Sequence, residues 1–425
     1  MIDESVQADL LLRGQIRPTA ARRFGLRWLP ISVFFLYSAL NMLDRQLLAA
    51  AAPAIRSEFH LSNSQYGLVV SVFSAVSMLT GPFAGLYIDW VGLTIGATVA
   101  LVLWSAAGIA TGFTHTFRGL VSCRVLLAAG ESGGGASPGA VLSQYMDARQ
   151  LGIGAAWLAG AVSLGAIAAP LVTAALAPRY GWRSVFIVCG VLGFLWVPLW
   201  LFTARFAPPR FPARRSAPIP IRRLFGDRRF WGVLVLYAMS RQTLWVSWTT
   251  LYFVQARGLT FVQANERYSW YPSAFGALGV FLVGALAMRW IRKGWSGSEA
   301  RSRLCWLFSP LVLATAAVPF IPSATLAALA IGASFLGAAS IWTNAHLMPI
   351  DLYGVTRSAF AYAVLECGYT ALQTVISPVV GALIDAHGFT PVCLLMPLFP
   401  LAGLLVFRAC FVGDRNQARS VPHVA

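Results

Sequence analysis

The stretch Phe117–Tyr145, FRGLVSCRVLLAAGESGGGASPGAVLSQY, decides the fold of this chain. It is long and apolar enough to cross a bilayer as a helix, yet Arg124 and Glu131 lie inside it. Positions i and i+7 are nearly two helical turns apart, so both side chains share one face, about 10 Å apart along the axis. An ionisable group at membrane depth normally faces a cavity, a substrate or another charge. The glycine run 133–135 gives the helix a thin flank that lets neighbours pack closely. The stretch therefore predicts a helix at the centre of a membrane-embedded bundle.

The composition is that of a polytopic membrane protein. Hydrophobic residues make up 58% of the 425 residues and charged residues only 11%, whereas a soluble domain is about 25% charged. The formal charge of +17 does not indicate nucleic-acid binding, because the basic residues cluster between apolar stretches, as the positive-inside rule describes. We therefore expect the lipid bilayer as the environment and no nucleic acid as a partner.

Twelve apolar stretches can be counted along the chain, and they predict an all-α membrane protein with twelve transmembrane helices in two six-helix halves. The longest polar interval, between the sixth and seventh stretches, is rich in Arg and Pro. We expect an N-terminal half over 1–204, a basic cytoplasmic linker over 205–229 and a C-terminal half over 230–425. The expected spans are 28–52, 65–89, 92–112, 117–146, 151–177, 182–204, 230–256, 268–291, 304–321, 324–348, 358–385 and 390–412.

The arginines of the linker and of both tails also predict the orientation. An even number of spans places both termini on the side of the linker, which is the cytoplasm. We expect a monomer in the inner membrane of a bacterium. The sequence has no Walker loop, zinc-ligand spacing or nucleophile elbow, so we expect no metal, no cofactor and no enzymatic activity.

Charged residues of the N-terminal half predict a functional site. Depth along the predicted spans puts Asp44, Arg45 and Arg124 at one level and Glu131 about 10 Å deeper. Two acids and two bases can pair across the helices. One interpretation is a structural charge network that locks the helices together. The other is that an arginine holds an anionic substrate while a carboxylate takes up a proton.

Two charged residues of the C-terminal half fall within expected spans. Arg241 lies near the midplane and is either a second anchor for a carboxylate or one partner of an inter-helix pair. Glu366 is a candidate for substrate binding, and the alternative is that it pairs with Arg241 or faces a wet cavity. Weaker candidates for substrate contact are Trp245, Asn344 and Gln373.

Several motifs carry a family resemblance. The segments NMLDRQLLAAAAPAI, LSNSQYGLVVS, GLYIDWVG and GWRSVFIVCGVLGFLWVPLW resemble, in order, the N-terminal half of the anion:cation symporter family of the major facilitator superfamily. The bacterial branch most similar in pattern carries sugar acids such as hexuronates, galactonate and glucarate. The resemblance implies proton symport of an organic anion, with Asp44 and Glu131 as the coupling carboxylates and Arg45 and Arg124 near them. It also implies a gating role for Asp89, although the basic residues that follow it in the family are replaced here by WVGLT.

The sequence thus predicts a secondary transporter that moves a small carboxylate together with protons by alternating access. The alternative is an exporter or antiporter for organic anions or drugs on the same fold. A membrane sensor is disfavoured because neither tail is long enough for a signalling domain. A channel is disfavoured because the charges within the spans are few and asymmetric.

Overall fold

The structure is a computed structural model, and it describes residues 28–147, 150–207, 209, 221–242, 244–354 and 358–418. The N-terminal tail, most of the basic linker and residues 419–425 lie outside these ranges. The predicted cytoplasmic tail and the proline-rich part of the linker are therefore predictions that the structure does not address.

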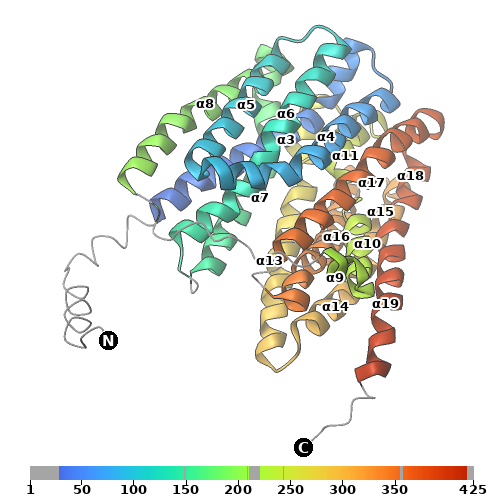
Figure 1. Cartoon of the computed structure of the whole chain (residues 1–425). Coiled ribbons are helices and arrows are strands. Elements are labelled where there is room, and N and C mark those ends of the chain that lie inside the picture. The colour runs from blue at the N-terminus through green and yellow to red at the C-terminus, as the bar shows by residue number, and fades with distance from the viewer. Residues whose placement is uncertain are drawn as a thin grey trace, which may run out of the picture.

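The N-terminal half consists of six long helices joined by short connections (Figure 1). Ser62 caps the second of them through a capping box with Gln65, and Thr116 caps the fourth. Gly92 and Gly181 adopt φ angles of 85° and 77°, a region that favours glycine, and so allow two abrupt reversals of the chain. The six helices are α3 (Trp28–Phe59), α4 (Asn63–Val91), α5 (Leu93–Gly112), α6 (Phe117–Tyr145), α7 (Leu151–Tyr180) and α8 (Trp182–Phe206).

The C-terminal half also crosses six times, but four of its crossings are interrupted. A short helix, α9 (Ile221–Gly226), precedes it. The interrupted crossings are α10 (Arg228–Ser240) with α11 (Trp245–Gln255), α12 (Phe261–Arg267) with α13 (Tyr271–Arg292), α14 (Gly297–Phe308) with η1 (Ser309–Leu313), α15 (Ala314–Ala317) and η2 (Val318–Phe320), and α18 (Phe389–Leu395) with α19 (Leu398–Ala418). The continuous ones are α16 (Ala324–Tyr353) and α17 (Ser358–His387).

Twelve crossings of the described chain confirm the predicted count. Nine helical segments there have the length and apolarity of a membrane span. Helices α3 and α6, of 32 and 29 residues, are also long enough, but they carry the central charges. The twelfth crossing is the interrupted pair of α10 and α11.

The two halves are joined most tightly at one end of the bundle, where α3 ends and α4 begins. We call this the closed end. There α4 and α17 run alongside each other (Figure 1). A Cβ added at Gly67 would lie 2.3 Å from the carbonyl oxygen of Ser377, and one at Gly381 would lie 2.3 Å from that of Asn63. Only glycine permits this approach of the two backbones.

Polar and apolar contacts both cross between the halves at the closed end. The carboxylate of Asp385 accepts hydrogen bonds from the backbone amides of Asn63 (2.9 Å) and Ser64 (2.8 Å). The Tyr66 hydroxyl donates to the carbonyl of Ser247 at 2.8 Å. One buried apolar cluster includes Leu47, Ile55 and Tyr66 from the N-terminal half and Trp248, Leu251 and Phe253 from the C-terminal half.

Candidate functional site

The centre of the N-terminal half holds an ion pair between α3 and α6. The Nε and Nη2 atoms of Arg45 each lie 2.9 Å from Oε2 of Glu131. Glu131 is buried, with 1% of its side chain exposed, whereas 38% of the Arg45 side chain is exposed. The Arg45 guanidinium also lies over the ring of Phe73, 5.3 Å from its centroid. Arg45 is therefore a partly exposed cation that is bound to a buried carboxylate.

Beside this pair lie two further charges that are almost completely buried. Asp44 is 4% exposed and Arg124 is 2% exposed. Asp44, Arg124 and Glu131 lie close enough to interact electrostatically. Among the described residues, four of their polar atoms find no hydrogen-bond partner: Asp44 Oδ2, Glu131 Oε1, and Arg124 Nε and Nη2. Because an unsatisfied buried polar group costs about 1–3 kcal/mol, and a charged one more, these atoms are available to a proton or a ligand.

The predicted order of depths is wrong in one respect. The pattern placed Asp44 and Arg45 level with Arg124. In the structure, α3 continues to Phe59 rather than ending near residue 52. Arg45 is consequently as far from the end of α3 as Glu131 is from the start of α6, about 21 Å along each helix. Arg45 is therefore level with Glu131 and binds it.

The thin flank predicted for α6 is present and holds the site together. A Cβ at Gly130 would lie 2.7 Å from the backbone nitrogen of Trp104, and one at Gly133 would lie 2.7 Å from Cβ of Ala100. Both contacts bring α5 against α6. A Cβ at Gly134 would lie 2.8 Å from Nδ2 of Asn41 on α3. Close packing on these faces fixes α6 and its charges relative to α3 and α5.

The C-terminal half carries a second ion pair, which answers the question left open by the sequence. Arg241 Nη1 lies 3.0 Å from Oε1 of Glu366, so these two residues bind each other. Arg241 also donates to the hydroxyl of Tyr237 at 2.5 Å, and that hydroxyl donates to Glu366. The ring of Tyr369 lies 4.2 Å below the Arg241 guanidinium. Both members of the pair are accessible, with 27% and 45% of their side chains exposed.

The weaker candidates for substrate contact have hydrogen bonds to other parts of the C-terminal half. Trp245 is buried and donates to Thr315 Oγ1 at 2.9 Å. Asn344 donates to the carbonyl of Ser340 and Gln373 to the hydroxyl of Ser377, each within its own helix. Asp89 is exposed in the last turn of α4. Trp245 also lines the cavity between the halves. Within the described part of the chain, Asn344, Gln373 and Asp89 have no contact that distinguishes a role in binding or gating, and all four roles stay predictions.

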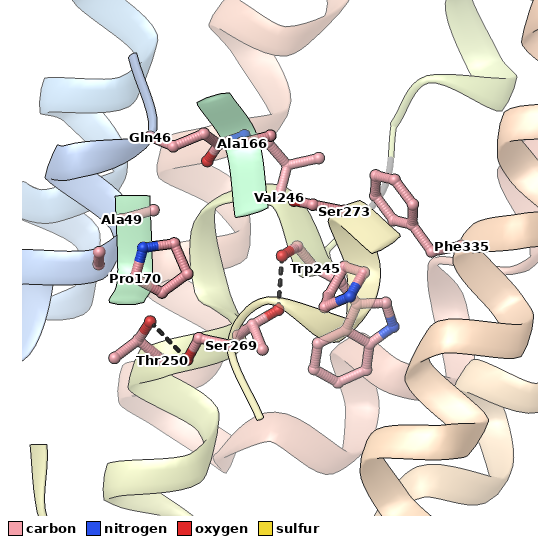
Figure 2. A pocket seen from close by; sticks show the side chains of 13 residues that line it. Gln46, Ala49, Ala166, Pro170, Trp245, Val246, Thr250, Ser269, Ser273 and Phe335 are labelled. Atoms are coloured by element: carbon pink, nitrogen blue, oxygen red, sulfur yellow. Dashed lines mark hydrogen bonds between the residues drawn. The ribbon is translucent and has the colours of Figure 1, made fainter. Parts of the chain in front are cut away.

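A small cavity lies between the halves (Figure 2). Its lining includes no charged residue. The polar members Thr250 and Ser269 hydrogen bond to each other at 3.0 Å, and Gln46 directly follows Arg45 on α3. Sequence reasoning missed these polar residues, although the position of Gln46 next to Arg45 was a usable signal. The lining residues are Gln46, Ala49, Ala50, Ala166, Pro170, Trp245, Val246, Thr249, Thr250, Ser269, Pro272, Ser273 and Phe335.

Comparison with known proteins places this arrangement in a family. The model of the Major Facilitator Superfamily matches residues 34–336. The chain is 25% identical over 410 residues to the hexuronate transporter of Escherichia coli K12, covering 90% of this chain and 93% of that protein. It is 28% identical over 400 residues to a probable sulfoacetate transporter of Cupriavidus necator, covering 86% and 89%. Among solved structures, a bacterial homologue of the human lysosomal transporter Spinster, in an inward-facing conformation, superimposes with a TM-score of 0.70 at 18% identity, covering 92% and 96%.

Proposed function

The chain belongs to the Major Facilitator Superfamily and is a multi-pass membrane transporter, not an enzyme; we propose that it carries a small organic anion together with protons. The proposed substrate is a sugar acid or a related small carboxylate. Relatives that cover most of the chain are named for hexuronate and sulfoacetate, which are both organic anions.

One observation carries the proposal: two arginines and two carboxylates meet within the N-terminal half, and three of the four have unpartnered buried atoms. Arg124 offers Nε and Nη2, which form a planar fork that matches a carboxylate. Arg45 is the more accessible cation of the two. A substrate carboxylate that engages these arginines competes with Glu131 for Arg45.

Proton coupling follows from the same competition. A carboxylate that loses its arginine partner in a water-poor site is destabilised as an anion and gains a proton more readily. We assign the coupling role to Glu131 and Asp44. Arrival of the substrate anion and uptake of a proton then favour each other, which is the thermodynamic requirement for symport.

The two ion pairs and the closed end support an alternating-access cycle. We propose that the halves 1–204 and 230–425 rock about the central charges, with 205–229 as the cytoplasmic linker. With both termini in the cytoplasm of a bacterium, the closed end faces outward. The proposed substrate contacts in the C-terminal half include Trp245, Asn344 and Gln373 beside the pair of Arg241 and Glu366, and Asp89 is the proposed gating residue. We propose a monomer as the working unit.

Transport in liposomes tests the proposal. Purified protein should accumulate a labelled hexuronate, galactonate or sulfoacetate when the outside is made acidic, and should only equilibrate it without a pH difference. Accumulation driven by the opposite pH gradient would support the alternative, an antiporter or exporter. Absence of transport of all three acids in either direction would contradict an organic-anion transporter of this class.

The orientation has its own test. Reporter fusions after residue 215 and at the C-terminus should both report the cytoplasm. A periplasmic signal from either fusion would overturn the proposed topology.

A further inference from the structure

The ion pair of the C-terminal half has a property that the proposed function does not explain. Arg241 is accessible between the halves, yet a carboxylate of the chain already occupies it. Glu366 binds Arg241 directly and is held there by the hydroxyl of Tyr237. A substrate carboxylate therefore meets an arginine whose charge is balanced.

Glu366 also lies within the electrostatic reach of the other half. It contacts Arg241 and Tyr237 directly, and it interacts electrostatically with His346 of the C-terminal half and Arg45 of the N-terminal half. Cys367, the next residue on α17, contacts the carbonyl of Met78 on α4 at 3.8 Å, so this part of α17 faces the N-terminal half. Glu366 thus binds Arg241 and lies on the part of α17 that faces the N-terminal half.

The charges at the centre of the protein sum to zero. The acids Asp44, Glu131 and Glu366 balance the bases Arg45, Arg124 and Arg241. A net charge in a water-poor site is unfavourable, so each negative charge brought in by a substrate must be matched by a proton or an unpaired arginine. The N-terminal half has unpartnered arginine atoms, on Arg124. In the C-terminal half, Arg241 bonds Glu366 and Tyr237 through Nη1, and the carboxylate of Glu366 already balances its positive charge.

We infer that Glu366 is a resident counter-ion of Arg241 and restricts the transporter to sugar acids that carry one carboxylate. This inference rests on the proposed function. The single carboxylate of the substrate binds at the arginines of the N-terminal half. The uncharged end, which carries hydroxyl groups, faces the pair of Arg241 and Glu366, where a carboxylate oxygen accepts hydrogen bonds from hydroxyls. A second carboxylate at that end would lie against Glu366 and be repelled.

Two pairs of open-chain acids isolate this effect. Gluconate and glucarate differ only in whether the far end is a hydroxymethyl group or a carboxylate, and galactonate and galactarate differ in the same way. At neutral pH an ordinary carboxyl group is ionised, so the second member of each pair is a dianion. We expect the wild type to bind and transport the monoanion at least about tenfold better than the dianion.

The Glu366→Gln variant should lower that preference by about tenfold or more, because Arg241 then becomes available to the second carboxylate. The double variant Arg241→Gln with Glu366→Gln should not show the improved binding and transport of the dianion, because the arginine that the single variant makes available is absent. Glu299→Gln is the matched control: this glutamate pairs with Arg303 on an exposed turn of α14 and should leave the preference unchanged. The preference for the monoanion is measured at pH 6 and at pH 8. The change caused by Glu366→Gln should have the same direction at both, which separates it from an effect of titrating His346.

The outcomes distinguish the inference from the proposed function. A wild type that transports these acids while Glu366→Gln leaves the ratio of monoanion to dianion unchanged overturns the inference alone. A double variant that still gains the dianion also overturns it. A wild type that neither binds nor transports any of the four acids overturns the inference together with this class of substrate. If Glu366→Gln does not elute as a folded protein, Glu366→Asn provides the same neutral side chain with less bulk.

Discussion

The charges of the two halves differ in how completely they are partnered. In the N-terminal half, Asp44, Arg124 and Glu131 are each less than 5% exposed and each has at least one polar atom without a partner. In the C-terminal half, Arg241 and Glu366 are accessible and bind each other and Tyr237. The more completely buried charges are thus the ones that have polar atoms without hydrogen-bond partners.

This difference separates two uses of charge within a membrane. A buried carboxylate or guanidinium that lacks a partner is expensive, and the cost falls when a proton or a ligand arrives. An accessible, paired charge costs little and can stay paired throughout a cycle. We therefore propose that substrate and proton change the energy of the protein in the N-terminal half, and that the C-terminal half selects the substrate.

The largest expected effect comes from neutralising the acids of the N-terminal half. Glu131→Gln and Asp44→Asn imitate the protonated carboxylate, so transport no longer requires a proton. We expect both variants to lose accumulation driven by a pH difference completely. They should still exchange substrate across the membrane, because exchange moves no net proton. Counterflow and acid-driven uptake in liposomes measure the two activities, with Glu299→Gln as a control. Accumulation that persists in both variants would mean that these charges form only a structural network.

Arg124→Lys should have the next largest effect. A lysine keeps the charge but replaces the planar fork by a single ammonium group, so it loses one of two parallel hydrogen bonds to a carboxylate. We expect substrate to bind about tenfold or more weakly. Arg118→Lys is the control, since Arg118 is exposed in the first turn of the same helix. Binding by Arg124→Lys as tight as that of the wild type would exclude this arginine from the substrate site.

The sequence predicts those features of the two halves that depend on neighbouring residues, but not the contacts between residues far apart in the chain. The twelve crossings follow from local apolarity and length, and the small flank of α6 follows from the glycines at 133–135. The pairing of Arg45 with Glu131 did not follow, because it depends on where α3 ends. Seven extra residues, up to Phe59, move Arg45 about 10 Å deeper. No apolar pattern marks that end, since Arg56 and Glu58 lie in the last turn of the helix.

Contacts in the C-terminal half were harder still to predict. The crossing of α10 and α11 breaks at Arg241 without a proline or glycine to mark the break. The two members of the ion pair are 125 residues apart in sequence, and the sequence offered two roles for each without choosing. The bonds from Asn63 and Ser64 to Asp385 span more than 300 residues and depend on the packing of whole halves.

The hydrogen bonds from Asn63 and Ser64 to Asp385 lead to a third prediction, with an effect of intermediate size. It concerns how the two halves close at the closed end. Asp385→Asn replaces one accepting oxygen by an amide nitrogen, which cannot accept from the first turn of α4. We expect the closed end to open about threefold to tenfold more often, given the usual value of a helix cap. Alkylation of a cysteine introduced by Ser247→Cys, followed by mass spectrometry of its peptide, reports this opening, because Ser247 contacts Tyr66 across the halves.

Glu58→Gln is the matched control for this measurement. Glu58 lies near the same end but binds Trp182 and Arg183 within the N-terminal half. It should leave the alkylation rate of the new cysteine unchanged. Equal alkylation rates in Asp385→Asn and in its parent would show that the hydrogen bonds from Asn63 and Ser64 to Asp385 do not hold the closed end together.

The smallest expected effect is at Asp227, a carboxylate that is fully partnered. It accepts from the backbone amide and side chain of Arg229 at the start of α10, and from the Tyr353 hydroxyl at the end of α16. Burial raises the pKa of Asp227, but the bonds from Arg229 and Tyr353 outweigh burial and hold the pKa below its usual value. Asp227→Ala should therefore lower stability by about 1 kcal/mol, as for other helix caps, and leave coupling intact.

The pH dependence of the stability lost in Asp227→Ala distinguishes a carboxylate with a structural role from one that couples transport to protons. Because the pKa of Asp227 is lowered in the folded state, its contribution is complete above the unfolded value of about 4 and disappears as the pH falls through the folded value. The melting temperature of Asp227→Ala should thus lie about 2 °C below that of the wild type at pH 7, and the gap should close towards pH 3. Glu266→Ala, at an exposed position of α12, should show no gap at either pH. A variant at Asp227 that melts like the wild type but fails to accumulate substrate would contradict the expectation that this fully partnered acid, outside the central charges, serves stability and not transport.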